Sequence, residues 1–220
     1  MSNEMTQQNT DGALAVCLRK KNDKTPVVFY ADRMNFKGET ILYSDVESIS
    51  ITASHTAYSI LFEVYSGICK LRLKDGRKLK WKTGSWGLFG INGIKRKKGY
   101  FAQFYAALLA TVAKKVSADY ISQIKLGGTV KIGGITLTPT EISGKRAMKS
   151  ISLPYSEIAG ANVYSCNVYI NKKEKNRSAF NAIPLNVNNA ICLLYIVNSL
   201  VGVETNTDAS SLEGGAPAEE

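Results

Sequence analysis

The sequence predicts an α+β fold that is mainly β, arranged as two antiparallel barrels or sandwiches, each closed by a C-terminal helix. Three observations lead to this prediction. Short alternating or β-branched runs, separated by turn residues, fill residues 13–82 and recur after residue 128. Each group of runs is followed by apolar residues at helical spacing. A short motif, Tyr-Ser-acid-aliphatic, occurs once in each group.

Seven short strands are expected in the first half of the chain. Five are expected at residues 13–18, 25–31, 39–43, 48–52 and 57–65, and the last two are the arms of a hairpin around Asp75-Gly76. An Asp-Gly pair between alternating runs favours a tight turn, because glycine accepts a positive φ. We expect a loop at Ser54-His55-Thr56 and a break in the chain at Gly67. This spacing of strands is typical of a meander, a small barrel or a sandwich.

The hairpin around Asp75-Gly76 concentrates positive charge. Residues 70–98 contain eleven Lys and Arg against one acid, which equals the formal net charge of the whole protein, +10. Because side chains alternate across a strand, each arm should hold its cations on one face. The cations concerned are Lys70, Arg72, Lys74, Lys78, Lys80 and Lys82. They form either a binding surface or a solvated outer face whose lysines prevent edge pairing.

A segment rich in glycine and apolar residues follows the hairpin. Glycine recurs at positions 84, 87, 90 and 93, which opposes both helix and strand and predicts a loop over residues 84–99. Such a loop either folds back over a hydrophobic cleft or offers its apolar groups to a partner or a bilayer interface. Its apolar residues include Trp86, Leu88, Phe89 and Ile91, and four cations follow, Lys95, Arg96, Lys97 and Lys98.

The two halves are divided near Leu126-Gly127-Gly128. An amphipathic helix is expected to begin at Phe101 and to continue to about Ile124, because its apolar residues recur at i, i+3, i+4 and i+7. The first domain is therefore expected at residues 13–126, and a shorter second domain at 127–202, ending in an apolar helix near residues 188–201. Polar residues 1–12 and the acidic tail 203–220 are expected to be disordered.

The repeated motif points to a duplication. Tyr43-Ser44-Asp45-Val46 and Tyr155-Ser156-Glu157-Ile158 are offset by 112 residues and occupy matching places among the expected strands. The stretch around the first copy resembles a signature of bacterial pleckstrin-homology-like (PH-like) proteins, and residues 180–194 resemble their closing strand and the entry to the capping helix. The resemblance spans residues 13–202. It implies two half-open antiparallel barrels, each plugged by a helix, and carries no catalytic residue.

No catalytic, cofactor or metal-binding pattern is found in the sequence. The single histidine, His55, has no identifiable nucleophile partner, and the glycine pairs match neither a phosphate-binding loop nor a dinucleotide-binding turn. The four cysteines lie far apart, which suits reduced, buried thiols. The N-terminus lacks the plan of a signal peptide, and the longest apolar run, residues 100–113, is too short to span a bilayer. We therefore expect a cytoplasmic protein that can be peripheral on the inner face of the membrane.

These observations lead to the hypothesis of a non-enzymatic module that docks on an anionic surface, foremost an acidic membrane leaflet. The cations of the hairpin and Lys95–Lys98 would meet the negative charge, and Trp86, Leu88, Phe89 and Ile91 would insert or contact a partner. An acidic protein is an alternative partner to the membrane, and an assembly scaffold engaged through residues 85–94 is an alternative function. Nucleic-acid binding is less favoured, because Trp81 alternates to the side opposite Lys80 and Lys82.

Overall fold

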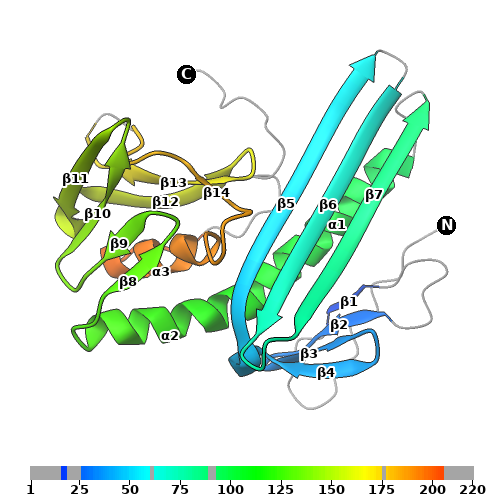
Figure 1. Ribbon diagram of the computed structural model, residues 1–220, viewed down its shortest axis with the longest axis horizontal. Coiled ribbons are helices and arrows are strands. Elements are labelled where there is room, and N and C mark those ends of the chain that lie inside the picture. The colour runs from blue at the N-terminus through cyan, green and yellow to red at the C-terminus, as the bar shows by residue number, and fades with distance from the viewer. Residues whose placement is uncertain (1–15, 19–25, 60–61, 89–92, 175–176, 206–220) are drawn as a thin grey trace.

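In its described residues the protein is an α+β structure dominated by four small antiparallel sheets, as the computed structural model in Figure 1 shows. The structure describes residues 16–18, 26–59, 62–88, 93–174 and 177–205. The predicted fold class, mainly β with helices, is confirmed at this level.

The first half consists of two sheets and a long helical segment. The first sheet is a meander of β1 (Val16–Leu18), β2 (Val27–Phe29), β3 (Arg33–Phe36) and β4 (Glu39–Leu42). A short 3-10 turn, η1 (Tyr43–Asp45), leads into the second meander of β5 (Val46–Ser59), β6 (Phe62–Leu73) and β7 (Lys78–Leu88). The helical segment consists of α1 (Gly93–Leu108), a π-helical turn η2 (Leu109–Ala113) and α2 (Lys114–Lys125).

The second half has the same order of elements in shorter form. Its first sheet contains β8 (Val130–Ile132), β9 (Ile135–Leu137), β10 (Glu141–Arg146) and β11 (Lys149–Pro154). The 3-10 turn η3 (Tyr155–Glu157) leads into β12 (Ile158–Tyr164), β13 (Asn167–Lys172) and β14 (Ile183–Pro184). Helix α3 (Cys192–Val201) follows.

The Tyr-Ser-acid motif forms the turn between the two sheets in both halves. The hydroxyl of Tyr43 donates to the carbonyl oxygen of Tyr30 at 2.7 Å, and that of Tyr155 donates to the carbonyl oxygen of Thr138 at 2.8 Å. Both acceptors stand at the same place, directly after the second strand of their half and three residues before the third. The motif therefore anchors the chain through its tyrosine at the point where it leaves one sheet for the other.

The two second sheets also match strand by strand. The β5–β6 register shifts between Val46 and Ser48, and the β12–β13 register shifts between Ile158 and Gly160, 112 residues later. The N–H of Lys74 bonds to Asp45 O at 2.8 Å, and the N–H of Lys173 bonds to Glu157 O at 2.9 Å. These pairs align β6 with β13 at an offset of 99 residues, which allows the two halves to be compared position by position.

Two expected breaks in the first half are wrong. The stretch Ser54-His55-Thr56 lies inside β5, which runs unbroken from Val46 to Ser59, and Gly67 lies inside β6. A glycine stands within this strand because α1 crosses the sheet there, and a Cβ at position 67 would overlap the ring of Phe101. The glycine permits close approach of helix and sheet, a role that spacing alone did not reveal.

The expected loop over residues 84–99 is also replaced by regular structure. Strand β7 continues to Leu88, paired with β6 throughout, and α1 begins at Gly93. Residues 89–92 lie outside the described part of the chain. Glycine has a low propensity for strands, but the hydrogen-bonded pairing of β7 along the whole of β6 outweighs this local preference.

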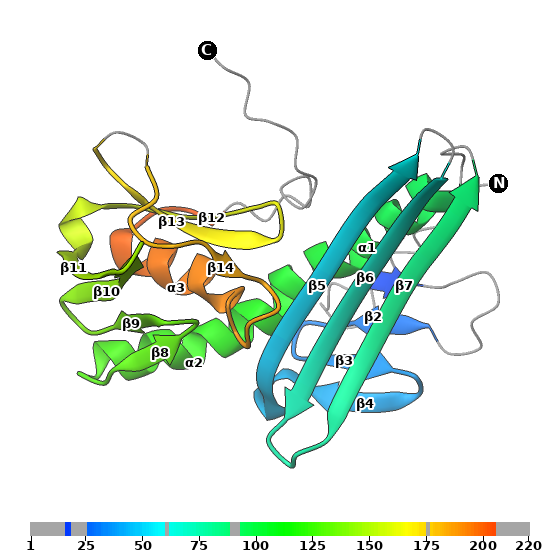
Figure 2. The ribbon, with the colours of Figure 1, turned by 45° about the horizontal axis from the view of Figure 1, so that its top comes forward.

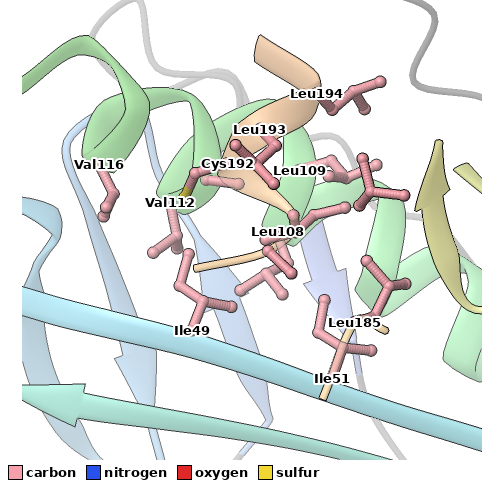
Figure 3. Close-up of a cluster of buried hydrophobic side chains, with 14 of the residues drawn as sticks. Ile49, Ile51, Leu108, Leu109, Val112, Val116, Leu185, Cys192, Leu193 and Leu194 are labelled. Carbon is pink, nitrogen blue, oxygen red and sulfur yellow. The ribbon is translucent and has the colours of Figure 1, made fainter. Parts of the chain in front are cut away.

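The two halves share one core. Figure 3 shows Ile49 and Ile51 of β5 gathered with Leu108, Leu185 and Leu193, which come from the helical segment and from the second half. The segment before α3 also adds to the edge of β5. The N–H of Ile51 bonds to Leu185 O at 2.8 Å, and the N–H of Asn189 bonds to Ile49 O at 2.8 Å.

A stack of aromatic rings holds α1 on the β5–β7 sheet. The ring of Trp81 lies 3.9 Å from that of Phe104, almost parallel to it, and Phe104 meets Phe29 edge to face. Trp81 is buried at 5% exposure, so the inner face of β7 faces this stack and its outer face is left for the lysines. The helical segment then continues across to α3, as both ribbon views show (Figures 1 and 2).

Candidate functional site

The outer face of β6 and β7 carries five exposed cations, which we name the basic face. Their neighbours along the strands, Leu71, Leu73 and Trp81, point the other way and are buried. This is the alternation expected for a half-buried sheet. The basic face consists of Lys70 and Arg72 on β6 and of Lys78, Lys80 and Lys82 on β7.

The register places like charges opposite one another. Lys70 pairs with Lys80 across the two strands, and Arg72 pairs with Lys78. Like charges in directly opposed positions destabilise a sheet. The crowding also lowers the pKa of Lys80, through hydrogen bonding from Lys82 and then through the positive charges of Lys82 and Lys70. The basic face is therefore a region of accumulated positive potential.

Few acids approach these cations. Arg72 forms an ion pair with Glu47 at 3.1 Å, on the side nearest β5. Among the residues that the structure describes, no carboxylate lies within ion-pair distance of Lys70, Lys78 or Lys80. On β5, the uncharged Ser50 stands opposite Lys70. The positive potential is therefore directed mainly to solvent.

The turn between β6 and β7 completes the charged hairpin. Gly76 has a φ of +88°, as expected for the Asp-Gly pair. Arg77 bonds to Asp75 at 2.6 Å and also contacts Glu39, so its charge is matched by acids. Lys74 is exposed in this turn, beyond the end of β6. The sequence predicted six cations on the outer face. Five of them lie on the paired strands, and the sixth, Lys74, lies beside them in the turn.

The other predicted contact residues fall at the far end of the sheet. The backbone of Trp86 and Leu88 belongs to β7, and Lys95–Lys98 belong to the first turns of α1. Cations at a helix N-terminus oppose the helix dipole, so these four are not explained by helix stability. Phe89 and Ile91 lie outside the described residues, as do the side chains of residues 85–98, so apolar insertion through Trp86, Leu88, Phe89 and Ile91 stays a prediction.

The second half contains an uncharged counterpart to part of the basic face. The outward face of β12 and β13 corresponds to that of β5 and β6, and it is uncharged at Asn162, Tyr164, Tyr169 and Asn171. We name it the neutral face. On β13, Tyr169 and Asn171 take the places that Lys70 and Arg72 hold on β6. Asn171 donates to Asn162 at 3.0 Å across the strands, and the rings of Tyr164 and Tyr169 lie 6.4 Å apart. The signal that could have found it is the 112-residue repeat, extended into the next two strands.

Other reactive groups are buried or isolated. Burial raises the pKa of the Cys69 and Cys192 thiols to about 12, which makes them poor nucleophiles. Within the described ranges, no cluster of three or more His, Cys, Asp or Glu is placed to hold a metal ion. None of the helices in the described part of the chain combines the length and the apolar character needed to cross a membrane.

Comparison of the chain with protein-family models, with curated protein sequences and with solved structures finds no significant match.

Proposed function

We propose that the protein is a non-enzymatic binding module, built from two PH-like halves, that docks on an acidic membrane leaflet through the basic face. Support for the PH-like relationship comes from the order of elements, which is a four-stranded meander, a tyrosine-anchored turn, a three-stranded meander and a helix in each half. The membrane is the partner that a broad, rigid face of solvent-directed cations fits best.

The observation that carries the proposal is the like-charge register. Lys70 opposes Lys80 and Arg72 opposes Lys78, an arrangement that works against the stability of the sheet. At the matching positions of β13 in the second half, Tyr169 and Asn171 replace Lys70 and Arg72, and β13 pairs with β12 there without charge. The strand pairing therefore does not require cations at these two positions, and a negatively charged partner would account for their presence.

Nucleic acid is a weaker candidate for the same face. Proteins that bind single strands set aromatic rings among the cations, where bases stack on them. Trp81, the aromatic residue nearest the lysines along β7, is buried and stacked on Phe104. None of the five residues of the basic face offers a ring to a base.

The test compares two variants with the same loss of charge. The first replaces lysines of the basic face, K70Q/K78Q/K80Q/K82Q, and the second replaces exposed lysines elsewhere, K114Q/K115Q/K125Q/K131Q. Cosedimentation is measured with phosphatidylcholine vesicles, with and without phosphatidylserine. We expect wild type to bind only the anionic vesicles, the first variant to bind about 100-fold more weakly, and the second to lose about tenfold or less, since screened charges far from the bilayer contribute little.

Three outcomes would contradict the proposal. Equal binding to neutral and anionic vesicles would remove the electrostatic argument, and equal losses in the two variants would remove the basic face as the site. A salt-sensitive shift of RNA or DNA by wild type, with no vesicle binding, would favour nucleic acid instead. Light scattering on a chain lacking residues 85–94 tests the scaffold alternative, because a change in oligomeric state would favour it.

A further inference from the structure

We propose that the turn between β10 and β11 is a second membrane contact, in which Met148 enters the interfacial region of an anionic bilayer. This inference rests on the proposed function and adds a contact in the other half of the molecule. The β10–β11 tip, residues 145–149, lies in the first sheet of the second half, away from the β5–β7 sheet in both ribbon views (Figures 1 and 2).

The tip displays a large apolar side chain to solvent. Met148 is 98% exposed, more than the other exposed large apolar residues of the described chain, Leu126, Val203 and Leu42. A single exposed apolar residue is ordinary on a protein surface. What sets Met148 apart is the structure that holds it and the charge that surrounds it.

The backbone of the tip is braced from outside. Ala147 adopts a φ of +52°, a left-handed conformation that a residue with a Cβ disfavours. Asn181 compensates for this: its Oδ1 accepts from Ala147 N–H at 2.9 Å, and its own N–H donates to Lys145 O at 2.8 Å. The turn is therefore kept in shape by a distant residue rather than by a Gly or Asn of its own.

The base of the hairpin is also fixed. A Cβ on Gly144 would lie 2.6 Å from Ile135 Cδ1 and 2.9 Å from Phe180 Cδ1, so the strand presses directly on the core just before the tip. Met148 thus projects from a hairpin whose base is packed against the core. Little backbone freedom is lost when such a turn enters a bilayer interface, which favours binding.

Positive charge surrounds the methionine. Lys145, Arg146 and Lys149 are all exposed, and Arg146 pairs directly with Lys149 across the hairpin. No ion pair joins any of the three to an acid among the described residues. An apolar tip ringed by cations with long aliphatic stems matches an anionic bilayer interface, where the stems and the methionine meet acyl chains and the charges meet headgroups.

The equivalent turn of the first half lacks these features. Lys37 and Gly38 form it with φ values of +56° and +87°, and the ammonium group of Lys37 lies over the ring of Phe36, 5.5 Å from its centre. It contains a glycine and displays no apolar side chain. The tip of the second half is therefore a local departure from the shared plan, like the basic face of the first half.

The experiment measures affinity and depth in the full-length protein. Met148→Ser is compared with Leu126→Ser, which removes another highly exposed apolar residue, on phosphatidylcholine–phosphatidylserine vesicles. We expect Met148→Ser to bind about threefold to tenfold more weakly and Leu126→Ser to bind as wild type. For depth, tryptophan is placed at each site, M148W and L126W, and acyl-chain-brominated lipids should quench the added fluorescence only in M148W.

The outcomes separate this inference from the proposed function. If K70Q/K78Q/K80Q/K82Q loses binding while Met148→Ser binds as wild type and M148W is not quenched, the tip is rejected and the basic face stands. If the basic-face variant binds as wild type while Met148→Ser is weakened and M148W is quenched, the tip stands and the basic face is rejected. If wild type binds no vesicle, both are rejected.

Discussion

The basic face and the neutral face share one pair of equivalent strands, β6 and β13, in two halves with the same order of elements, yet their chemistry is opposite. Lys70 and Arg72 on β6 correspond to Tyr169 and Asn171 on β13. On the neutral face the side chains interact favourably with one another, through the Asn171–Asn162 bond and the Tyr164–Tyr169 contact. On the basic face the opposed residues repel one another.

This difference shows which features serve the fold and which do not. The strand order, the bulge and the anchored tyrosine occur in both halves, so they belong to the architecture. The cations occur in one half and oppose its stability, as do Lys95–Lys98 at the start of α1. A feature that is absent from the equivalent position and unfavourable where it is present is best explained by a partner.

The inner faces of the same strands differ as well, and this leads to the largest expected effect on stability. Trp81 stands opposite Cys69, and its counterpart Ile183 stands opposite Val168. Trp81→Ala would remove the ring stacked on Phe104 and should destabilise the protein by about 4 kcal/mol, against about 3 kcal/mol for Ile183→Ala. Denaturant unfolding measures both, and a smaller loss for Trp81→Ala would show that the stack is not central to the core.

Two asparagines fill equivalent roles at the edges of β5 and β12. Asn198 bonds to both the N–H and the carbonyl of Ala161, at 2.6 and 3.1 Å, and Asn189 bonds to Ile49 N–H at 2.9 Å and to Glu47 O at 3.1 Å. Ile49 and Ala161 are offset by the same 112 residues.

Replacing either asparagine by alanine leaves backbone groups of a strand edge without a partner. We expect the free energy of unfolding to fall by about 3 kcal/mol in Asn198→Ala and by about 2 kcal/mol in Asn189→Ala, because Asn189 lies nearer the surface. The exposed Asn162→Ala is the control, with a change below about 0.5 kcal/mol. Urea unfolding that shows no loss for Asn189→Ala would mean that its bonds do not help to join the two halves.

The two motif tyrosines allow a finer comparison. Tyr43 is buried and Tyr155 is half-buried, although each donates one hydrogen bond to a carbonyl. Tyr43→Phe should cost about 1.5 kcal/mol and Tyr155→Phe about 0.5 kcal/mol, because water can replace the lost bond more readily at the half-buried site. Thermal unfolding of the single and double variants measures the two stability losses. A larger loss for Tyr155→Phe would contradict the prediction that the more buried hydrogen bond of Tyr43 contributes more.

The smallest effect is expected from alkaline pH. Burial raises the pKa of Tyr43 and of Tyr155 from 10.0 to about 12. A phenol whose pKa is raised in the folded state stabilises the protein fully below the unfolded value, and this contribution is lost as pH rises from about 10 towards 12. Unfolding free energies between pH 9 and pH 11 should therefore fall less steeply in the Tyr43→Phe variant. An identical slope in wild type and variant would show that this tyrosine does not titrate with unfolding.

Local patterns predicted the features that depend on neighbouring residues. The alternation from Lys70 to Lys82 placed the cations on one face, Asp75-Gly76 marked the turn, and the spacing after Phe101 marked the helix. Each depends on residues only a few positions apart, where strand and helix geometry constrain the side chains directly.

The errors share a different cause. Gly67 and the glycines at 84 and 87 read as breaks, but they lie in strands whose pairing and packing come from distant parts of the chain. Gly67 faces Phe101, more than thirty residues away. Such glycines look alike in sequence whether they end a strand or admit a helix, and only the packed structure distinguishes the two.

The sequence by itself determined the fold class, the repeated tyrosine turn and the grouping of positive charge, since all three follow from local periodicity and composition. The tertiary structure decided that the two halves share one core, with Leu185 and Asn189 bonded to the edge of β5. It also decided that the positions of β13 that match Lys70 and Arg72 are neutral and that Met148 is exposed on a turn held by Asn181. These features depend on contacts between residues far apart in the chain, and no local pattern encodes such contacts.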